Sequence, residues 1–466
     1  MNKKIRDFIY TFGANILNFL MGFITGFLIP GFLDVDNYAY IKLFGFYAGY
    51  VGILHLGFLD GIYLKYGSYD YGELPKEKFR GYVRFMFLFQ LVESVIMAIG
   101  IFIFSKEYNR SIVFYYVVAN IVILNLTTMF AFIHQFTKRF KLYSINMVFT
   151  KLFYVVGCVL FIFFNIKGYN EFIIMQTIVN LIILLIYLYF NKEIVFGHSD
   201  SILANFKEYE YLIKSGFFVM IGNLMTQLVL GIDRFFVDKF FAINDFAMYS
   251  FAYTLISLFS ILLGSITMVV YPYLARAKKE NFNNVYERSR ILITILMAIT
   301  MASYFLIKVI VIKFLPKYTD SFGILLFLVP TVLYSAQISI LISNFYKVLK
   351  ETKDYTKNNI IALVLSIVTN VIGIIIYKDV ITISIATLVA FILWVAYSDY
   401  YFKKKLDIHI LKSQLLDIYV VIVFLICAIF LNWLLGLIVY LFFIGIYIII
   451  KHKEDIKEMF NIIKKR

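Results

Sequence analysis

The sequence predicts an all-α membrane protein with about fourteen transmembrane helices, arranged as two parallel six-helix lobes around a central cavity plus two C-terminal helices. Three observations support this. The chain is 62% hydrophobic and 16% charged, with a mean hydropathy of +0.84, whereas soluble domains carry about 25% charge. Its apolar runs are about twenty residues long, which suits spanning helices and not the shorter strands of a barrel. Its basic residues fall mainly in alternate loops.

The apolar runs and their flanking charges define the expected spans. They are residues 8–30, 38–60, 81–104, 111–133, 143–164, 170–190, 215–237, 246–273, 289–314, 321–346, 358–377, 380–402, 414–430 and 433–450. We expect the first span to be retained, because it is longer than the apolar region of a cleaved signal. The longest loop on the external side is Asp238 to Asp245, eight residues, so no separate domain is expected there.

The basic residues indicate topology. Alternate loops that include both termini hold 32 Lys and Arg, and the opposite loops hold 7. By the positive-inside rule, both termini are cytoplasmic. The net charge of +15 therefore reflects orientation in the membrane and does not point to nucleic acid. Five further cations lie within spans: Lys42, Arg84, Lys151, Arg234 and Lys308.

The two cysteines, Cys158 and Cys427, lie in apolar spans, and the five histidines are scattered. Neither pattern has the spacing of a disulfide framework or a metal site. We expect buried, unreactive thiols and no bound metal.

A linker divides the chain. The stretch "NKEIVFGHSDSILANFKEYEYLIKSG" could form an amphipathic helix on the inner membrane surface, capped by Ser199 or Ser201. Its apolar positions are Ile202, Leu203, Phe206, Tyr209 and Leu212. The expected parts are an N-terminal lobe at 1–190, a cytoplasmic linker at 191–214, a C-terminal lobe at 215–402, and two extra helices with a basic tail at 403–466.

The two lobes contain a weak internal repeat at an offset of 208 residues. "GFLIPGFLDVDNYAYI" (26–41) aligns without gaps on "RFFVDKFFAINDFAMY" (234–249), and both stretches are expected to be external hairpins between successive spans. Because each repeat holds an even number of helices, the lobes are parallel copies. Parallel lobes with a cavity between them are typical of alternating-access carriers.

Residues 233–277, "DRFFVDKFFAINDFAMYSFAYTLISLFSILLGSITMVVYPYLARA", resemble the signature of the polysaccharide or O-unit flippases. Its elements here are Asp233-Arg234, Ala247-x-Tyr249-Ser250 and Pro272-x-x-x-Arg276. "YVGILHLGFLDGIYLKYG" (50–67) is similar to the family's first-lobe pattern. The family belongs to the multidrug, oligosaccharidyl-lipid and polysaccharide exporter (MOP) superfamily. The resemblance implies two six-helix lobes, with two extra C-terminal helices in many polysaccharide members.

The resemblance also implies a substrate, an isoprenoid pyrophosphate that bears a short glycan, and its binding calls for cations and amides. Asn223, Gln227, Leu230 and Arg234 follow one helical face, so Arg234 is expected to point into the cleft. The alternative is an i, i+4 pair with Asp238. Asn15 is the repeat partner of Asn223; both could line the cleft or simply pack helices together.

Two carboxylates are candidates for ion coupling, and one further cation is a candidate for the substrate. Lys151 lies about 12 Å deep in its span and is expected to bind substrate. Glu93, with Gln90 on the same face, could bind a coupling proton or Na⁺, or could neutralise Lys151. Asp233 is the second coupling candidate.

The predicted function is a flippase in a bacterial plasma membrane that moves lipid-linked oligosaccharides from the cytoplasmic to the external leaflet. No cofactor and no covalent chemistry are implied. The expected partners are the lipid-linked oligosaccharide, membrane lipids and polysaccharide polymerase machinery. One alternative is a cation-coupled drug antiporter or a peptidoglycan-precursor flippase of the same superfamily. Another is a membrane polysaccharide polymerase or ligase, which the short external loops argue against.

Overall fold

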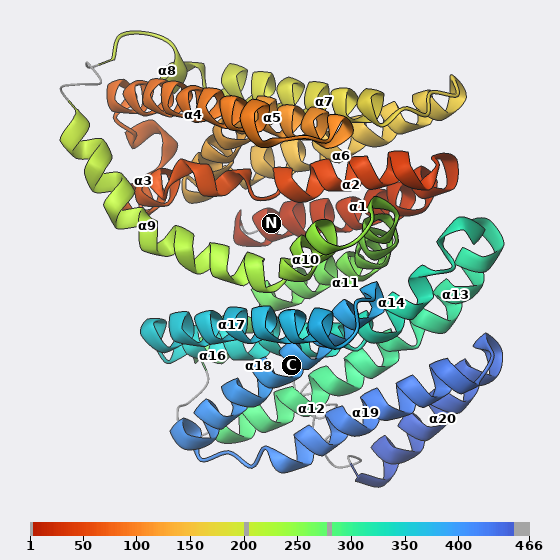
Figure 1. Ribbon diagram of the computed structural model, residues 1–466. Helices are drawn as coiled ribbons and strands as arrows, with labels where there is room; N and C mark the ends of the chain where they lie inside the picture. Colours follow the sequence, from red (N-terminus) through yellow and green to blue (C-terminus); the bar gives the residue numbers. More distant parts are fainter. Residues whose placement is uncertain (1–2, 200–204, 277–281, 452–466) are drawn as a thin grey trace. The chain divides into compact units, whose positions relative to one another are not determined.

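The computed structural model describes residues 3–199, 205–276 and 282–451, and every regular element in these ranges is helical (Figure 1). The chain forms two compact units, Met1–Gln227 (the N-terminal unit) and Leu228–Arg466 (the C-terminal unit). Eleven described helices are long and apolar enough to cross a membrane, or up to thirteen if each of two bent pairs is one span. The all-α membrane class is confirmed. Predicted span 246–273 coincides with α11, which is not among these thirteen, so the count of fourteen stays a prediction.

The N-terminal unit has a core formed by α3, α4, α5, α7 and α9. Phe58, Phe130, Tyr187 and Leu212 lie in this core and are almost completely buried. Burial of such large apolar side chains inside the unit fixes how its helices pack. The elements are α1 (Lys3–Phe32), α2 (Val35–Ala48), the 3₁₀ helix η1 (Val51–His55), α3 (Phe58–Tyr66), α4 (Lys76–Phe104), α5 (Tyr108–Phe136), α6 (Phe140–Phe163), α7 (Tyr169–Phe190), α8 (Lys192–Val195) and α9 (Phe206–Val229).

The C-terminal unit holds the remaining helices. Within it α17 packs along α18, and α19 packs against both α20 and α12 (Figure 1). The elements are α10 (Ile232–Phe240), α11 (Ile243–Arg276), α12 (Phe282–Met301), α13 (Ser303–Phe314), α14 (Ser321–Leu328), α15 (Thr331–Ala336), a π-helix (Gln337–Ile342), α16 (Ser343–Val348), α17 (Thr352–Ile376), α18 (Val380–Leu406), α19 (Leu411–Phe430) and α20 (Trp433–Lys451).

Three spans that hydropathy predicts as continuous are interrupted. Span 38–60 breaks between η1 and α3, where Leu56 and Gly57 adopt φ of 48° and 84°, and the two parts bend by 60°. Span 321–346 bends by 41° near Pro330, which has no N–H to donate to the preceding turn. Span 215–237 breaks before Gly231, the residue that precedes α10. Hydropathy does not detect these breaks, because the residues around them are as apolar as the helices.

The two predicted hairpins are confirmed. Residues 26–41 contain the end of α1, a two-residue connection and the start of α2, and residues 234–249 contain the same arrangement of α10 and α11. An aspartate side chain accepts a backbone N–H at each turn: Asp34 accepts from Asn37, and Asp245 accepts from Ala242. Such side-chain bonds satisfy N–H groups that a helix start leaves without partners.

The linker leads into α9, whose first turns pack on the N-terminal unit. Tyr209 and Leu212, from the predicted amphipathic face, are 1% and 0% exposed in the core of this unit, so this part of the linker contacts protein. Glu208 forms ion pairs with Lys65 and Lys78 at 2.7 and 3.3 Å. Ser201, Ile202 and Leu203 lie outside the described residues, as do the side chains of Pro272 and Arg276 in α11.

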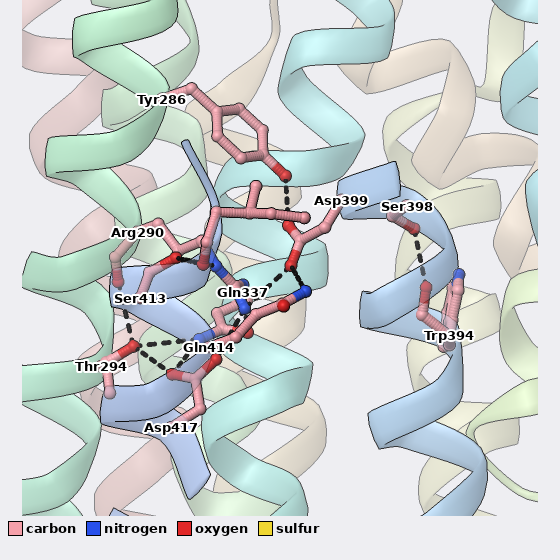
Figure 2. A network of polar contacts seen from close by, with 11 residues as sticks. Tyr286, Arg290, Thr294, Gln337, Trp394, Ser398, Asp399, Ser413, Gln414 and Asp417 are labelled. Carbon is pink, nitrogen blue, oxygen red and sulfur yellow. Dashed lines mark hydrogen bonds and ion pairs between the residues drawn. The ribbon is translucent and has the colours of Figure 1, made fainter. Parts of the chain in front are cut away.

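A buried polar network joins α19 to α12 and α18 (Figure 2). Nη2 of Arg290 lies 2.9 Å from Asp399 and 2.6 Å from Asp417, and all three side chains are at most 3% exposed. Arg290 also donates to Gln337, the first residue of the π-helix, at 2.8 Å, and to Ser413 at 3.0 Å. Tyr286, Thr294, Gln337 and Gln414 donate to the two carboxylates. The C-terminal helix pair is thus fixed by charged contacts as well as by apolar packing.

Candidate functional site

The site with the clearest chemistry begins at α10, directly after the break in the seventh predicted span. Asp233 lies in the first turn of α10 and is 3% exposed. Its Oδ1 accepts the backbone N–H of Arg234 at 2.8 Å, and its Oδ2 accepts the hydroxyl of Tyr249 at 2.7 Å. A carboxylate at a helix N-terminus is favoured by the exposed N–H groups there. These contacts hold the Asp233 side chain in a defined orientation.

The guanidinium of Arg234 lies over the ring of Tyr253, with its central carbon 3.7 Å from the ring centroid. The Tyr253 hydroxyl donates to the carbonyl of Leu230 at 3.3 Å, so the ring is tied to the break in the span. Stacking involves the face of the guanidinium and leaves its N–H donors in the plane, directed past the ring. Arg234 is therefore held in a geometry in which these donors can approach an oxyanion edge-on.

A small cavity of about 40 Å³ lies beside these residues in the C-terminal unit. Asp233 and Tyr253 line it, and Thr331, Ser335 and Thr387 contribute hydroxyl groups to the lining. One carboxylate surrounded by hydroxyl oxygens can hold a proton or a small cation. Across the described residues, no group of three or more His, Cys, Asp or Glu side chains could hold a metal ion. Both cysteines are free and buried, as predicted.

The predicted polar stripe needs a correction. The sequence places Asn223, Gln227 and Arg234 on one face of a continuous helix, but α9 ends at Val229 and α10 begins at Ile232. The i, i+11 spacing consequently no longer aligns Arg234 with the two amides. The alternative pairing of Arg234 with Asp238 stays a prediction; Asp238 lies one turn later in α10 and is 2% exposed.

Four other predicted substrate-binding residues lie in the N-terminal unit. Asn15 is half-buried on α1, and Lys151 is exposed on α6, a helix that packs against α1. Asn223 and Gln227 are exposed on α9. The Gln227 amide donates to the carbonyl of Gly49 at 2.8 Å, at the C-terminal end of α2. Gln227 thus satisfies a carbonyl at a helix end, which is a structural role that its spacing in the sequence did not reveal.

Glu93 does not neutralise Lys151. In the described part of the chain, no ion pair joins the two, and the contact of the Glu93 carboxylate is the Gln90 amide at 2.8 Å. Glu93 lies mid-way along α4 and is partly buried. Of the two alternatives that the sequence leaves open, ion binding by Glu93 is the one that stays a prediction.

Several polar residues in the structure were not predicted from the sequence. Tyr253 is one of 37 tyrosines, so composition gave no reason to select it. Arg290, Asp399 and Asp417 each lie a few residues inside a predicted span, near the end that the basic loops assign to the cytoplasm. One cation and two anions at matching depths in three spans were a usable signal. Charges at such depths are normally paired.

Residues 5–278 match the model of the family described as polysaccharide biosynthesis protein. No curated protein matches the sequence. Among solved structures, the fold is similar to that of the lipid II flippase MurJ in an inward closed conformation, with a TM-score of 0.70 and 18% identity over 95% of this chain and 99% of that chain. It is also similar to an inward-facing multidrug resistance MATE family transporter of the MOP superfamily, with a TM-score of 0.65 and 14% identity over 86% of this chain and 99% of that one.

A mutant of the Vibrio cholerae MATE transporter VcmN is similar as well, with a TM-score of 0.56 and 11% identity over 87% of this chain and 96% of that chain. These structural likenesses identify the fold, and the family match covers more than half of the sequence. The chain therefore belongs to the polysaccharide biosynthesis protein family and has the fold of the flippases and transporters of the MOP superfamily.

Proposed function

We propose that the chain is a flippase that moves isoprenoid-pyrophosphate-linked oligosaccharide units from the cytoplasmic to the external leaflet by alternating access. The observation that carries this proposal is the family match in a chain whose fold is similar to a lipid flippase over 95% of its length. The units would supply surface polysaccharide synthesis, with polymerisation left to partner machinery. The location is a bacterial plasma membrane with both termini cytoplasmic, as the 32-to-7 distribution of basic residues favours.

Arg234 is the proposed pyrophosphate donor. Its guanidinium is held by Tyr253, and a guanidinium can donate two parallel hydrogen bonds to one phosphate. Lys151 would add a second cation, and Asn15, Asn223 and Gln227 would contact phosphate or sugar hydroxyls. Of these amides, Gln227 has the weakest support, because its side chain already binds the end of α2.

Transport against a gradient needs an energy source, and the two coupling candidates are in different units. Asp233 faces a small hydroxyl-lined cavity, and Glu93 lies beside Gln90 at the broken second span. Each carries one negative charge at a position where a proton or a monovalent cation would neutralise it. No resident cofactor is proposed.

Two alternatives in the same superfamily have an observation in their favour. The likeness to MATE transporters favours a cation-coupled drug antiporter, and the likeness to MurJ favours a peptidoglycan-precursor flippase. A polymerase or ligase has less support, because the connections on the external side are two to six residues long and leave little room for a catalytic loop.

A deletion strain tests the proposal. Loss of the protein should trap short lipid-linked repeat units in the cytoplasmic leaflet, and mass spectrometry should identify their glycan. Accumulation of external repeat units would instead indicate a polymerase. Unchanged glycans with increased drug sensitivity would indicate an antiporter, and trapped peptidoglycan precursor would indicate the second alternative.

A further inference from the structure

The break between η1 and α3 leaves backbone carbonyls that two buried amides bind. The carbonyl of Leu54 accepts Nε2 of Gln90 at 2.9 Å, and the carbonyl of Val51 accepts Nδ2 of Asn125 at 3.2 Å. Gln90 comes from α4 and Asn125 from α5, and both side chains are fully buried. Each carbonyl oxygen has two lone pairs, so one hydrogen bond leaves it able to accept a further contact.

Asn125 has an acceptor that the protein does not satisfy. Its Nδ2 donates to the Val51 carbonyl and to Oε1 of Gln90, whereas its Oδ1 is buried and has no hydrogen-bond partner among the described residues. Because Oδ1 and Nδ2 belong to one small amide group, this oxygen lies within the same cluster. Buried acceptors without a donor are uncommon, and an ion is one of the groups that can satisfy them.

Glu93 supplies a negative charge to this cluster. Its Oε2 accepts Nε2 of Gln90 at 2.8 Å, the same amide nitrogen that binds the Leu54 carbonyl. Within the described ranges, Glu93 forms no ion pair with a basic side chain. The other charged groups at the break are His55 and Asp60, which face each other at 3.8 Å and are both buried.

We propose that Glu93, Asn125 and the carbonyls of Val51 and Leu54 form a binding site for a monovalent cation of the size of Na⁺. All of these groups offer oxygen atoms, the ligands that alkali and alkaline-earth cations prefer. One carboxylate balances one positive charge, so a divalent ion would leave net charge inside the membrane. Unwound backbone carbonyls in a broken span are an established way to coordinate Na⁺ in transporters.

Two different roles for the same residues lead to different behaviour. Gln90 and Asn125 could serve only to replace the N–H donors that the broken helix lacks, and Glu93 could be neutralised by a proton. The purely structural role predicts no response to any cation, and protonation predicts a response to pH that is independent of Na⁺. A coupling role for the site rests on the proposed transport function, but cation binding by the purified protein does not.

The test measures thermal unfolding of the purified full-length protein in detergent, titrated with NaCl against choline chloride at constant ionic strength and pH. A cation that binds the folded state raises the unfolding temperature in a saturable way. We expect such a rise with Na⁺, and its loss in Glu93→Gln and Asn125→Ala. The matched control is Asn120→Ala, which removes another fully buried amide of α5, one that binds Tyr116, Thr177 and Asn180 and not this cluster. The control should keep the Na⁺ response.

Equal unfolding temperatures in Na⁺ and choline would overturn the proposal, as would an undiminished Na⁺ response in Glu93→Gln. A response to pH alone would do so as well, in favour of a proton. Glu93→Gln preserves size and keeps an oxygen that can accept from Gln90, so it decides the question even if Asn125→Ala fails to fold. Because no glycan enters the assay, its failure would leave the flippase proposal standing.

Discussion

Arg290 should be among the most costly residues of the chain to replace. Its guanidinium is 1% exposed and contacts two carboxylates that are at most 3% exposed. Replacement by Gln would leave Asp399 and Asp417 buried without a cation. Removing one partner of a buried ion pair costs about 3–5 kcal/mol, which lowers the folded-to-unfolded ratio roughly a hundred- to a few-thousand-fold. Native proteins have a total stability of only about 5–15 kcal/mol.

The assay compares membrane abundance and detergent unfolding temperature for Arg290→Gln and for Arg288→Gln, an exposed arginine two residues earlier on α12. The first variant should be strongly reduced and the second should be close to wild type. Changing Asp399 and Asp417 to Asn together with Arg290→Gln should recover much of the loss, because no unpaired charge then remains. Equal abundance of the two single variants would refute the reasoning. Failure of the triple variant to recover would assign the cost to lost hydrogen bonds and not to charge.

Three further predictions follow from the structure and the basic-residue pattern. Arg234→Ala should abolish glycan export at normal membrane abundance and Arg234→Lys should retain part of it, whereas recovery of export in Arg234→Ala/Asp238→Ala would show that Arg234 only braces Asp238. Gly61→Ala should lower the unfolding temperature, because a Cβ there would lie 2.0 Å from the Leu212 carbonyl; Gly100→Ala, with nothing within 4 Å, should not. In intact cells an impermeant thiol reagent should label cysteines at three external sites, and labelling of three cytoplasmic ones would contradict the topology. The external sites are Asn37, Asn244 and Thr319, and the cytoplasmic sites are Asn283, Lys353 and Lys404.

The helices could be predicted from hydropathy, because a spanning helix needs a long apolar run and nothing else in this sequence has that length. The breaks could not. Gly57 and Gly231 mark two of them, but glycine is also common within unbroken membrane helices. The π-helix that starts at Gln337 left no readable signal. These breaks matter for function, because one positions Arg234 and another leaves the carbonyls that Gln90 and Asn125 bind.

The candidate site was predictable only where a charge stood alone in an apolar run. Asp233 and Arg234 met that condition, and the structure places both beside one cavity. Arg290 did not meet it, because it lies two residues inside its predicted span and resembles a cytoplasmic flanking charge. Tyr253 was hidden by the abundance of aromatic residues. The partners of each charge come from helices distant in the sequence, and spacing along one helix cannot reveal them.

The central claim is that the protein moves a lipid-linked glycan across a bilayer. The most direct test reconstitutes purified protein in liposomes that contain a fluorescent isoprenoid-pyrophosphate-linked oligosaccharide in both leaflets, and then adds an impermeant quencher. The claim predicts that wild-type protein brings the inner-leaflet lipid into reach of the quencher and that Arg234→Ala, folded and equally inserted, does not. Fluorescence loss no greater than in protein-free liposomes, or equal loss for the wild type and Arg234→Ala, would contradict it.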